Sequence, residues 1–154
     1  MVTLHRVSDV DDLISQAALK FVDTVARIQA AGGGLHHDGV ARVVLTGGGA
    51  GIGVLHELAR LDFAAQQQGE EFPAHRIDWS RVHVFFGDER NVPVSDADSN
   101  EGQARSALLN HVDIPDQNIH GFDLGAVSME AAASAYEPEL KEFAPNGFDL
   151  HLLG

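Results

Sequence analysis

The residues Asp88, Glu89 and Arg90 place two carboxylates and a guanidinium one residue after the mostly apolar run Val82–Phe86. A guanidinium can bind a phosphate or carboxylate group through two parallel hydrogen bonds. A nearby carboxylate can orient a hydroxyl group or accept a proton as a general base. These residue types suit a site for a small anionic molecule, and a solvated charged loop is the alternative interpretation.

A second candidate segment is the glycine-rich stretch that follows the apolar residues Val43–Leu45 and begins with Thr46. It fits neither common nucleotide-binding pattern. The dinucleotide pattern fails at Ile52 or Val54, and Val54-Leu55 replaces the Lys-Ser/Thr pair of a phosphate-binding loop. Glycine still lets backbone N–H groups approach an anion, and a helix N-terminus adds partial positive charge. The segment therefore predicts a cradle for an anion or a sugar, with a tight packing turn as the alternative.

Further polar residues carry weaker signals. Ser99 is expected to cap a helix, and Asn100 to face the same crevice or to close an Asx turn. The nine histidines show no metal-binding spacing, so no metal site is predicted. His83 and His151 fall inside predicted strands, where packed and hydrogen-bonded imidazoles are expected.

Composition limits the class of partner. The net charge of −13, from 23 acidic and 10 basic residues, argues against nucleic acid or an anionic membrane surface as the main partner. It leaves room for a small anionic substrate, because local donors can outweigh a distant negative surface. The chain has no cysteine and no pattern of a signal peptide or membrane span. We therefore expect a cytoplasmic protein.

The elements that must position these residues alternate between strands and helices. Apolar spacing predicts strands at 43–45, at 82–86, within 114–122 and at 148–153. It predicts a helix over residues 9–30 with Ser8 as its cap, a helix through Leu61 followed by a loop over 66–76, and a helix after Ser99. A last helix is predicted over 128–143, and Pro138 is expected to kink or split it. Such alternation predicts an α/β fold with an open, mainly parallel sheet and helices on both faces. Because ligands bind beyond the carboxyl ends of parallel strands, both candidate segments are expected at one edge of the sheet.

Taken together, the motifs resemble the N-terminal part of the 6-phosphogluconolactonase family, within the glucosamine-6-phosphate isomerase/6-phosphogluconolactonase superfamily. The matching motifs are Leu45-Thr46-Gly47-Gly48-Gly49, Trp79, Asp88-Glu89-Arg90-Asn91-Val92-Pro93, Ser99-Asn100 with Arg105, Leu108 and Leu109, and Phe148-Asp149-Leu150 with Leu152-Leu153-Gly154. They cover nearly the whole chain in order. The Asp-Glu-Arg segment with the later Ser-Asn pair is the most specific of them.

The resemblance implies a Rossmann-like fold and hydrolysis of 6-phospho-D-glucono-1,5-lactone to 6-phosphogluconate in the oxidative pentose phosphate pathway. It implies a phosphorylated sugar lactone as the small-molecule partner and no metal or organic cofactor; the oligomeric state stays open. By carry-over, Asp88 and Arg90 would be catalytic. The substrate-binding residues would be Thr46, Gly47, Gly48, Gly49, Glu89 and Asn100.

One departure concerns the general base. In the family, the catalytic histidine lies in a Gly-x-Asp-Gly-His segment, and Gly154 corresponds to its first residue. We therefore expect residues 1–154 to form a single, truncated sugar-phosphate-binding domain that lacks its C-terminal strands. We also expect the histidine beyond Gly154, and this chain to be inactive by itself.

Two other functions compete with lactone hydrolysis. Glucosamine-6-phosphate deaminases or isomerases resemble this chain but typically carry Asp-Glu-Tyr, so Arg90 favours the lactonase. A non-enzymatic sugar-phosphate sensor could also use this fold. The acidic charge does not suit a DNA-binding regulator.

Overall fold

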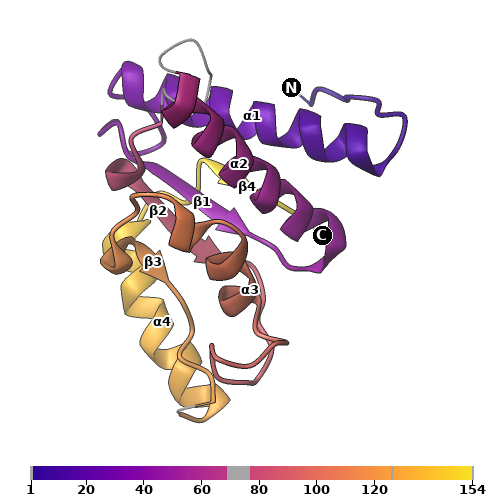
Figure 1. The fold of residues 1–154 in the computed structure, drawn as a ribbon. Helices are drawn as coiled ribbons and strands as arrows, with labels where there is room; N and C mark the ends of the chain where they lie inside the picture. Colours follow the sequence, from indigo (N-terminus) through magenta and orange to yellow (C-terminus); the bar gives the residue numbers. More distant parts are fainter. Residues whose placement is uncertain (1, 69–76, 126, 154) are drawn as a thin grey trace.

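A four-stranded parallel sheet organises the chain, shown in Figure 1 from the computed structural model, which describes residues 2–68, 77–125 and 127–153. The strands are β1 (Ala41–Leu45), β2 (Val82–Phe86), β3 (Ile119–His120) and β4 (Leu150–His151), in the order β3-β2-β1-β4. Leu45 pairs with Phe86, so β1 and β2 end at the same level. The chain moves from β1 outward to β2 and β3, then returns to pair β4 with the other side of β1. The predicted parallel α/β sheet is confirmed.

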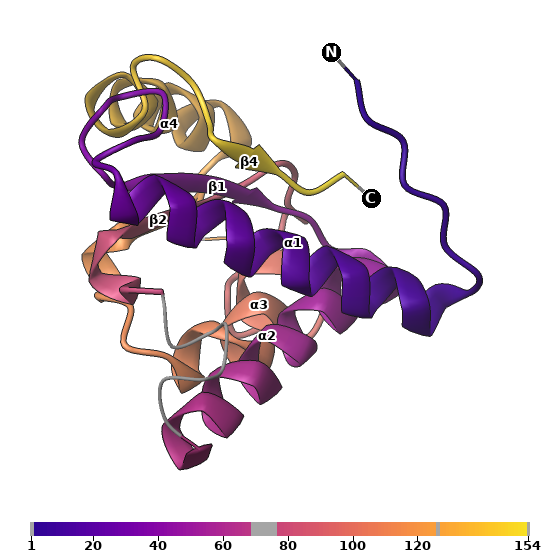
Figure 2. The same cartoon turned by 90° about the horizontal axis from the view of Figure 1, so that it is seen from above.

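Helices cover both faces of this sheet, as Figure 2 shows from above. The helices α1 (Val10–Ala30), α2 (Gly48–Gln68) and α3 (Asn100–Ala107) pack on one face, and α4 (Met129–Phe143) packs on the other. Short 3₁₀ turns occupy Trp79–Arg81, Leu109–His111 and Asp116–Asn118. No helix in the described part of the chain is both long and apolar enough to cross a membrane.

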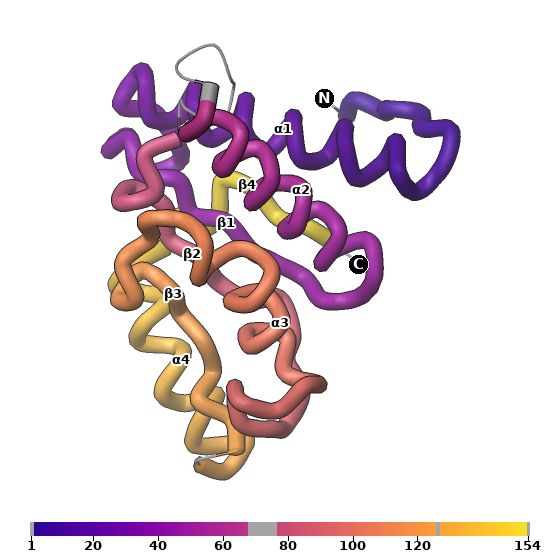
Figure 3. The backbone as a smooth tube through the Cα atoms, in the orientation of Figure 1, coloured from indigo at the N-terminus to yellow at the C-terminus, as the bar shows by residue number. Residues whose placement is uncertain are grey.

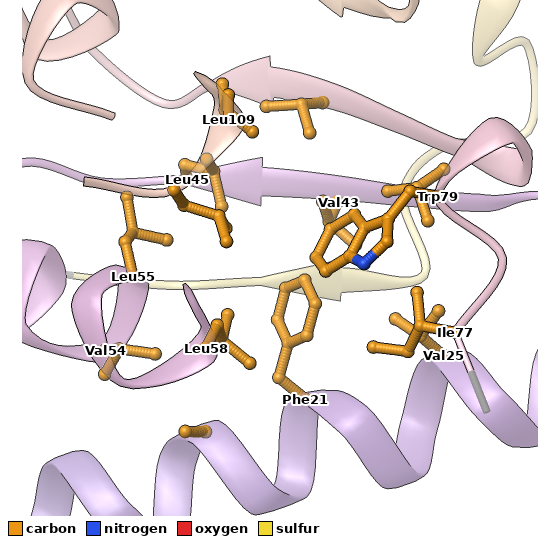
Figure 4. Packing of buried hydrophobic residues seen from close by; sticks show 14 of the residues in the cluster. Phe21, Val25, Val43, Leu45, Val54, Leu55, Leu58, Ile77, Trp79 and Leu109 are labelled. Carbon is orange, nitrogen blue, oxygen red and sulfur yellow. The ribbon is translucent and has the colours of Figure 1, made fainter. Parts of the chain in front are cut away.

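The larger core lies between β1, β2 and the helices α1 and α2. Phe21 of α1 stacks on Trp79, with ring centroids 6.3 Å apart, and Figure 4 shows both rings beside Val43. Leu55 and Leu58 of α2 are completely buried in the same cluster. Burial of apolar surface on this scale is the main force that holds the helices to the sheet and fixes the loops at its edge.

Several element boundaries differ from those predicted. The cap of α1 is Asp9 instead of Ser8, because the Asp9 carboxylate accepts the N–H of Asp12 while Asp12 accepts the N–H of Ser8. Helix α2 begins inside the glycine stretch and includes residues 66–68 of the predicted loop; residues 69–76 lie outside the described part. The strand predicted over 148–153 has only two residues in β4.

Helix α4 runs through Pro138 without being split. Tyr136 and Leu140 lie on either side of the proline and pack in the second core, with Tyr136 also donating a hydrogen bond to the His120 carbonyl. These tertiary contacts hold the helix together across the carbonyl that the proline leaves without a donor.

Three titratable side chains are connected by hydrogen bonds on the sheet face that α4 covers, opposite α1. His83 Nδ1 lies 2.8 Å from His120 Nε2, and His120 Nδ1 lies 2.5 Å from a Glu139 carboxylate oxygen. His120 is buried and stacks on Phe85, with ring centroids 4.6 Å apart. The prediction of a packed, hydrogen-bonded imidazole at His83 is confirmed.

Acid is expected to destabilise the fold through His83. Burial lowers the pKa of His83 to about 4, with further lowering by His120 and Arg42 and an opposing effect of Asp38. An unfolded histidine has a pKa of about 6.5. Below that pH the unfolded chain binds the proton more readily, so stability is lost as the pH falls from about 6.5 toward 4.

The measurement is urea unfolding at pH 7.5 and pH 5. His83→Gln has no proton to gain and is expected to lose less free energy of unfolding over this interval than the wild type. Glu139 and His120 remain in both proteins, so a smaller loss in the variant reflects removal of the His83 imidazole and of its contact with His120. Equal losses would contradict the assignment.

Candidate functional site

A cavity of about 560 Å³ opens at the carboxyl ends of β1, β2 and β4. Its lining residues are Thr46, Gly47, Gly48, Gly87, Asp88, Arg90, Asn100, His151, Leu152 and Leu153. The cavity lies where β1 is flanked by β2 on one side and β4 on the other, the position at which open α/β sheets bind ligands. Figure 3 shows the C-terminal end of the chain close to the turn from β1 into α2.

Most of the predicted site residues gather at this cavity. Thr46, Gly47, Gly48, Asp88, Arg90 and Asn100 line it directly. Gly49 lines an adjoining hollow together with Arg90 and Asn100. Glu89 instead lines a separate groove against α4. The two loops are therefore juxtaposed as predicted, and the individual roles of these residues stay predictions.

Two glycines of the loop are required for different reasons, Gly47 for a close contact and Gly48 for its backbone conformation. A Cβ on Gly47 would overlap the Asn100 amide, lying 2.8 Å from its Cγ and still closer to Oδ1. Gly48 has a φ of +83°, a backbone conformation that residues other than glycine rarely adopt. The 21-residue helix α2 begins at Gly48, so the positive end of its dipole lies at the cavity wall. The loop is thus both a tight packing turn and a surface suited to a negative group.

The loop after β2 carries two charged side chains that differ in their partners, the hydrogen-bonded carboxylate of Asp88 and the guanidinium of Arg90. Asn100 Nδ2 donates to the Asp88 carbonyl and to Asp88 Oδ1, each at 3.2 Å. Arg90 is exposed, and its guanidinium has no hydrogen bond or ion pair with any residue in the described ranges. Five donors on this side chain are available to a bound anion.

Helix α3 begins at the edge of the cavity. Ser99 Oγ accepts the N–H of Gly102 at 3.0 Å, so the predicted cap is confirmed. The helix starts at Asn100, whose side chain is almost completely buried. Both oxygens of the Glu89 carboxylate bond to donors at this helix start.

His151 and the two leucines after it were missed as cavity residues. The prediction that His151 is a packed, hydrogen-bonded imidazole is wrong, because its side chain is exposed at the cavity. A Cβ on Gly87 would lie 3.4 Å from His151 Nε2, an ordinary van der Waals contact, so Gly87 is a neighbour of His151 that does not determine its position. The strand predicted over 148–153 placed His151 inside a strand, whereas β4 ends at this residue.

Metal chemistry has no obvious anchor in this part of the chain. Among residues 2–68, 77–125 and 127–153, no group of three histidine or acidic side chains is arranged to hold a metal ion. The cavity instead offers a guanidinium, carboxylate and amide groups, an imidazole and the start of α2.

Comparisons with known proteins give a consistent result. The family model described as glucosamine-6-phosphate isomerases/6-phosphogluconolactonase matches residues 8–154. A 6-phosphogluconolactonase of Mycobacterium leprae is 46% identical over 74% of this chain and 45% of its own length. One from Mycobacterium tuberculosis is 42% identical over 95% of this chain and 56% of its own length.

A solved structure resembles the chain as well. The 6-phosphogluconolactonase of Thermotoga maritima superposes with a TM-score of 0.64 at 26% identity, over 84% of this chain and 50% of its own. The chain spans about half the length of the relatives that it matches.

Proposed function

The chain belongs to the glucosamine-6-phosphate isomerase/6-phosphogluconolactonase family, and we propose that the protein hydrolyses 6-phospho-D-glucono-1,5-lactone to 6-phosphogluconate. In this proposal it acts in the cytoplasm, in the oxidative pentose phosphate pathway. The substrate is a phosphorylated sugar lactone, an anion that matches the donors of the cavity.

The observation that carries this proposal is the Arg90 guanidinium beside Asp88 in the cavity, for which the described residues offer no hydrogen-bond or ion-pair partner. Arginine at this position favours a lactonase over a deaminase, which typically has tyrosine there. The relatives at 42% and 46% identity are named 6-phosphogluconolactonases, which supports the same choice.

The reaction requires attack by water on the lactone carbonyl carbon, and the ring oxygen leaves with a proton as the hydroxyl group. Negative charge develops on the carbonyl oxygen in between, and preorganised donors stabilise it. We assign this task to Arg90 and the glycine loop. Asp88, held by Asn100, would orient the lactone. The family resemblance assigns the general base to a histidine beyond Gly154.

A direct assay of the full-length protein tests this proposal. The lactone hydrolyses spontaneously, so the measurement is the proton release or ³¹P NMR rate above the rate without protein. We expect a protein-dependent increase with the lactone and no ammonia release from glucosamine 6-phosphate. Ammonia release without lactone hydrolysis would establish the deaminase alternative and overturn the proposal.

A further inference from the structure

The Glu89 carboxylate is saturated by donors from the chain itself. Oε1 accepts the N–H of Asn100 at 2.6 Å and the N–H of Arg90 at 2.8 Å. Oε2 accepts the N–H of Glu101 at 2.9 Å and the Ser99 hydroxyl at 3.1 Å. A carboxylate has about four lone-pair sites, so these four donors use its capacity.

These bonds fasten the loop after β2 to the start of α3. Three of them cross sequence separations of 10, 11 and 12 residues. The first N–H groups of a helix have no intrahelical acceptor, and a carboxylate is the acceptor that the helix dipole favours there. Hydrogen bonds to a charged acceptor are also stronger than neutral ones. Glu89 therefore fixes where α3 begins.

Fixing the start of α3 also fixes Asn100, the first residue of that helix. Its backbone N–H is held by Glu89, while its amide group donates to Asp88 and fills the space that Gly47 leaves open. Asn100 thereby connects both loops of the cavity. A shift of its backbone would disturb the contacts of its side chain with both Asp88 and Gly47.

We propose that Glu89 is a positioning residue of this site, acting through Asn100 on Asp88 and the Gly47 loop. A direct contact with substrate, as expected from the sequence, would require Glu89 to release one of its four donors. The inference rests on the proposed lactonase function for its effect on catalysis. The contacts that carry it are present without a ligand.

The test is a double-mutant cycle in the full-length protein with Glu89→Gln and Asn100→Ala. Glutamine keeps the shape of the side chain but turns an NH₂ group toward backbone N–H donors. We expect kcat/KM to fall about 10- to 100-fold in Glu89→Gln, mainly through kcat, since small misplacements of reacting groups have effects of this size. In the Asn100→Ala background the same change should cost less than about 3-fold, because the two residues act as a unit.

Glu57→Gln is the matched control, since Glu57 pairs with Arg60 on α2 and does not line the cavity. Its kcat/KM should equal that of the wild type. All proteins are assayed well below their unfolding temperatures, so that loss of folded protein does not enter. If the effects of Glu89→Gln and Asn100→Ala multiply fully, Glu89 acts independently of Asn100 and the inference is wrong.

Amide hydrogen exchange separates this inference from the lactonase proposal. Without any ligand, the N–H groups of Asn100 and Glu101 should exchange at least about 10-fold faster in Glu89→Gln, as expected for lost hydrogen bonds at a helix start. Amides of α1 should not change. Faster exchange in a protein that lacks lactonase activity would reject the proposed function and support the positioning role of Glu89. Unchanged exchange in an active enzyme would reject the positioning role of Glu89 alone.

Discussion

Arg90→Ala is expected to lower kcat/KM for the lactone by about 30- to 1000-fold, equivalent to about 2–4 kcal/mol of transition-state stabilisation. The Arg90 side chain is exposed at the cavity and has no partner among the described residues. Its removal therefore breaks no contact that holds this part of the fold. The thermal midpoint should stay within about 1 °C of the wild type, as for a surface substitution away from packed groups. Loss of activity at unchanged stability is the signature of a residue that contacts the reacting substrate.

Two further variants make this result specific. Arg90→Lys keeps the charge but not the planar pair of donors, so it should recover only part of the lost activity. Arg60→Ala removes another exposed arginine, one that pairs with Glu57 and does not line the cavity, and should leave kcat/KM unchanged. Steady-state kinetics with the lactone measure all three. Wild-type kinetics for Arg90→Ala would remove Arg90 from the site.

The layout of the fold and the location of the site could be predicted from short sequence patterns. Val82–Phe86 is apolar except for His83, which is typical of a strand covered on both faces, and the structure has β2 at these residues. Parallel strands end at one edge, so Thr46 and Asp88 had to lie near each other once the strand–helix alternation was recognised. The same patterns predicted the helix of residues 9–30 to within one residue of its start.

The separate roles of the three side chains in the Asp88-Glu89-Arg90 segment could not be predicted in the same way. Adjacent charged residues look alike in a sequence, but their side chains leave the loop in different directions. Which carboxylate faces the cavity depends on where α3 begins, and that depends on contacts between residues 10 to 12 positions apart. His151 was missed because the strand predicted over 148–153 placed it inside a strand, whereas β4 ends at this residue and leaves it at the cavity.

Gly47→Ala is expected to lower kcat/KM by about 100-fold or more, since displacement of a catalytic group by about 1 Å has effects of this size. The new methyl group would overlap the Asn100 amide, whose Cγ lies 2.8 Å from the Cβ position. Asn100 is 5% exposed and hydrogen-bonded to Asp88, so it cannot simply swing into solvent. Overpacking of this kind also costs about 1–3 kcal/mol of stability, which thermal unfolding would detect.

A second substitution separates the two effects. Asn100→Ala removes the overlapping amide, so the Gly47→Ala/Asn100→Ala double variant should be no less stable than Asn100→Ala alone. Its kcat/KM should stay low, because Asp88 then lacks the amide that orients it. Gly33→Ala is the matched control: a Cβ there meets only an ordinary contact of 3.5 Å, away from the cavity, and both stability and activity should hold. A double variant with wild-type activity would show that catalysis does not need the Asn100 side chain, and the site would have to be rebuilt around Arg90 and the glycine loop alone.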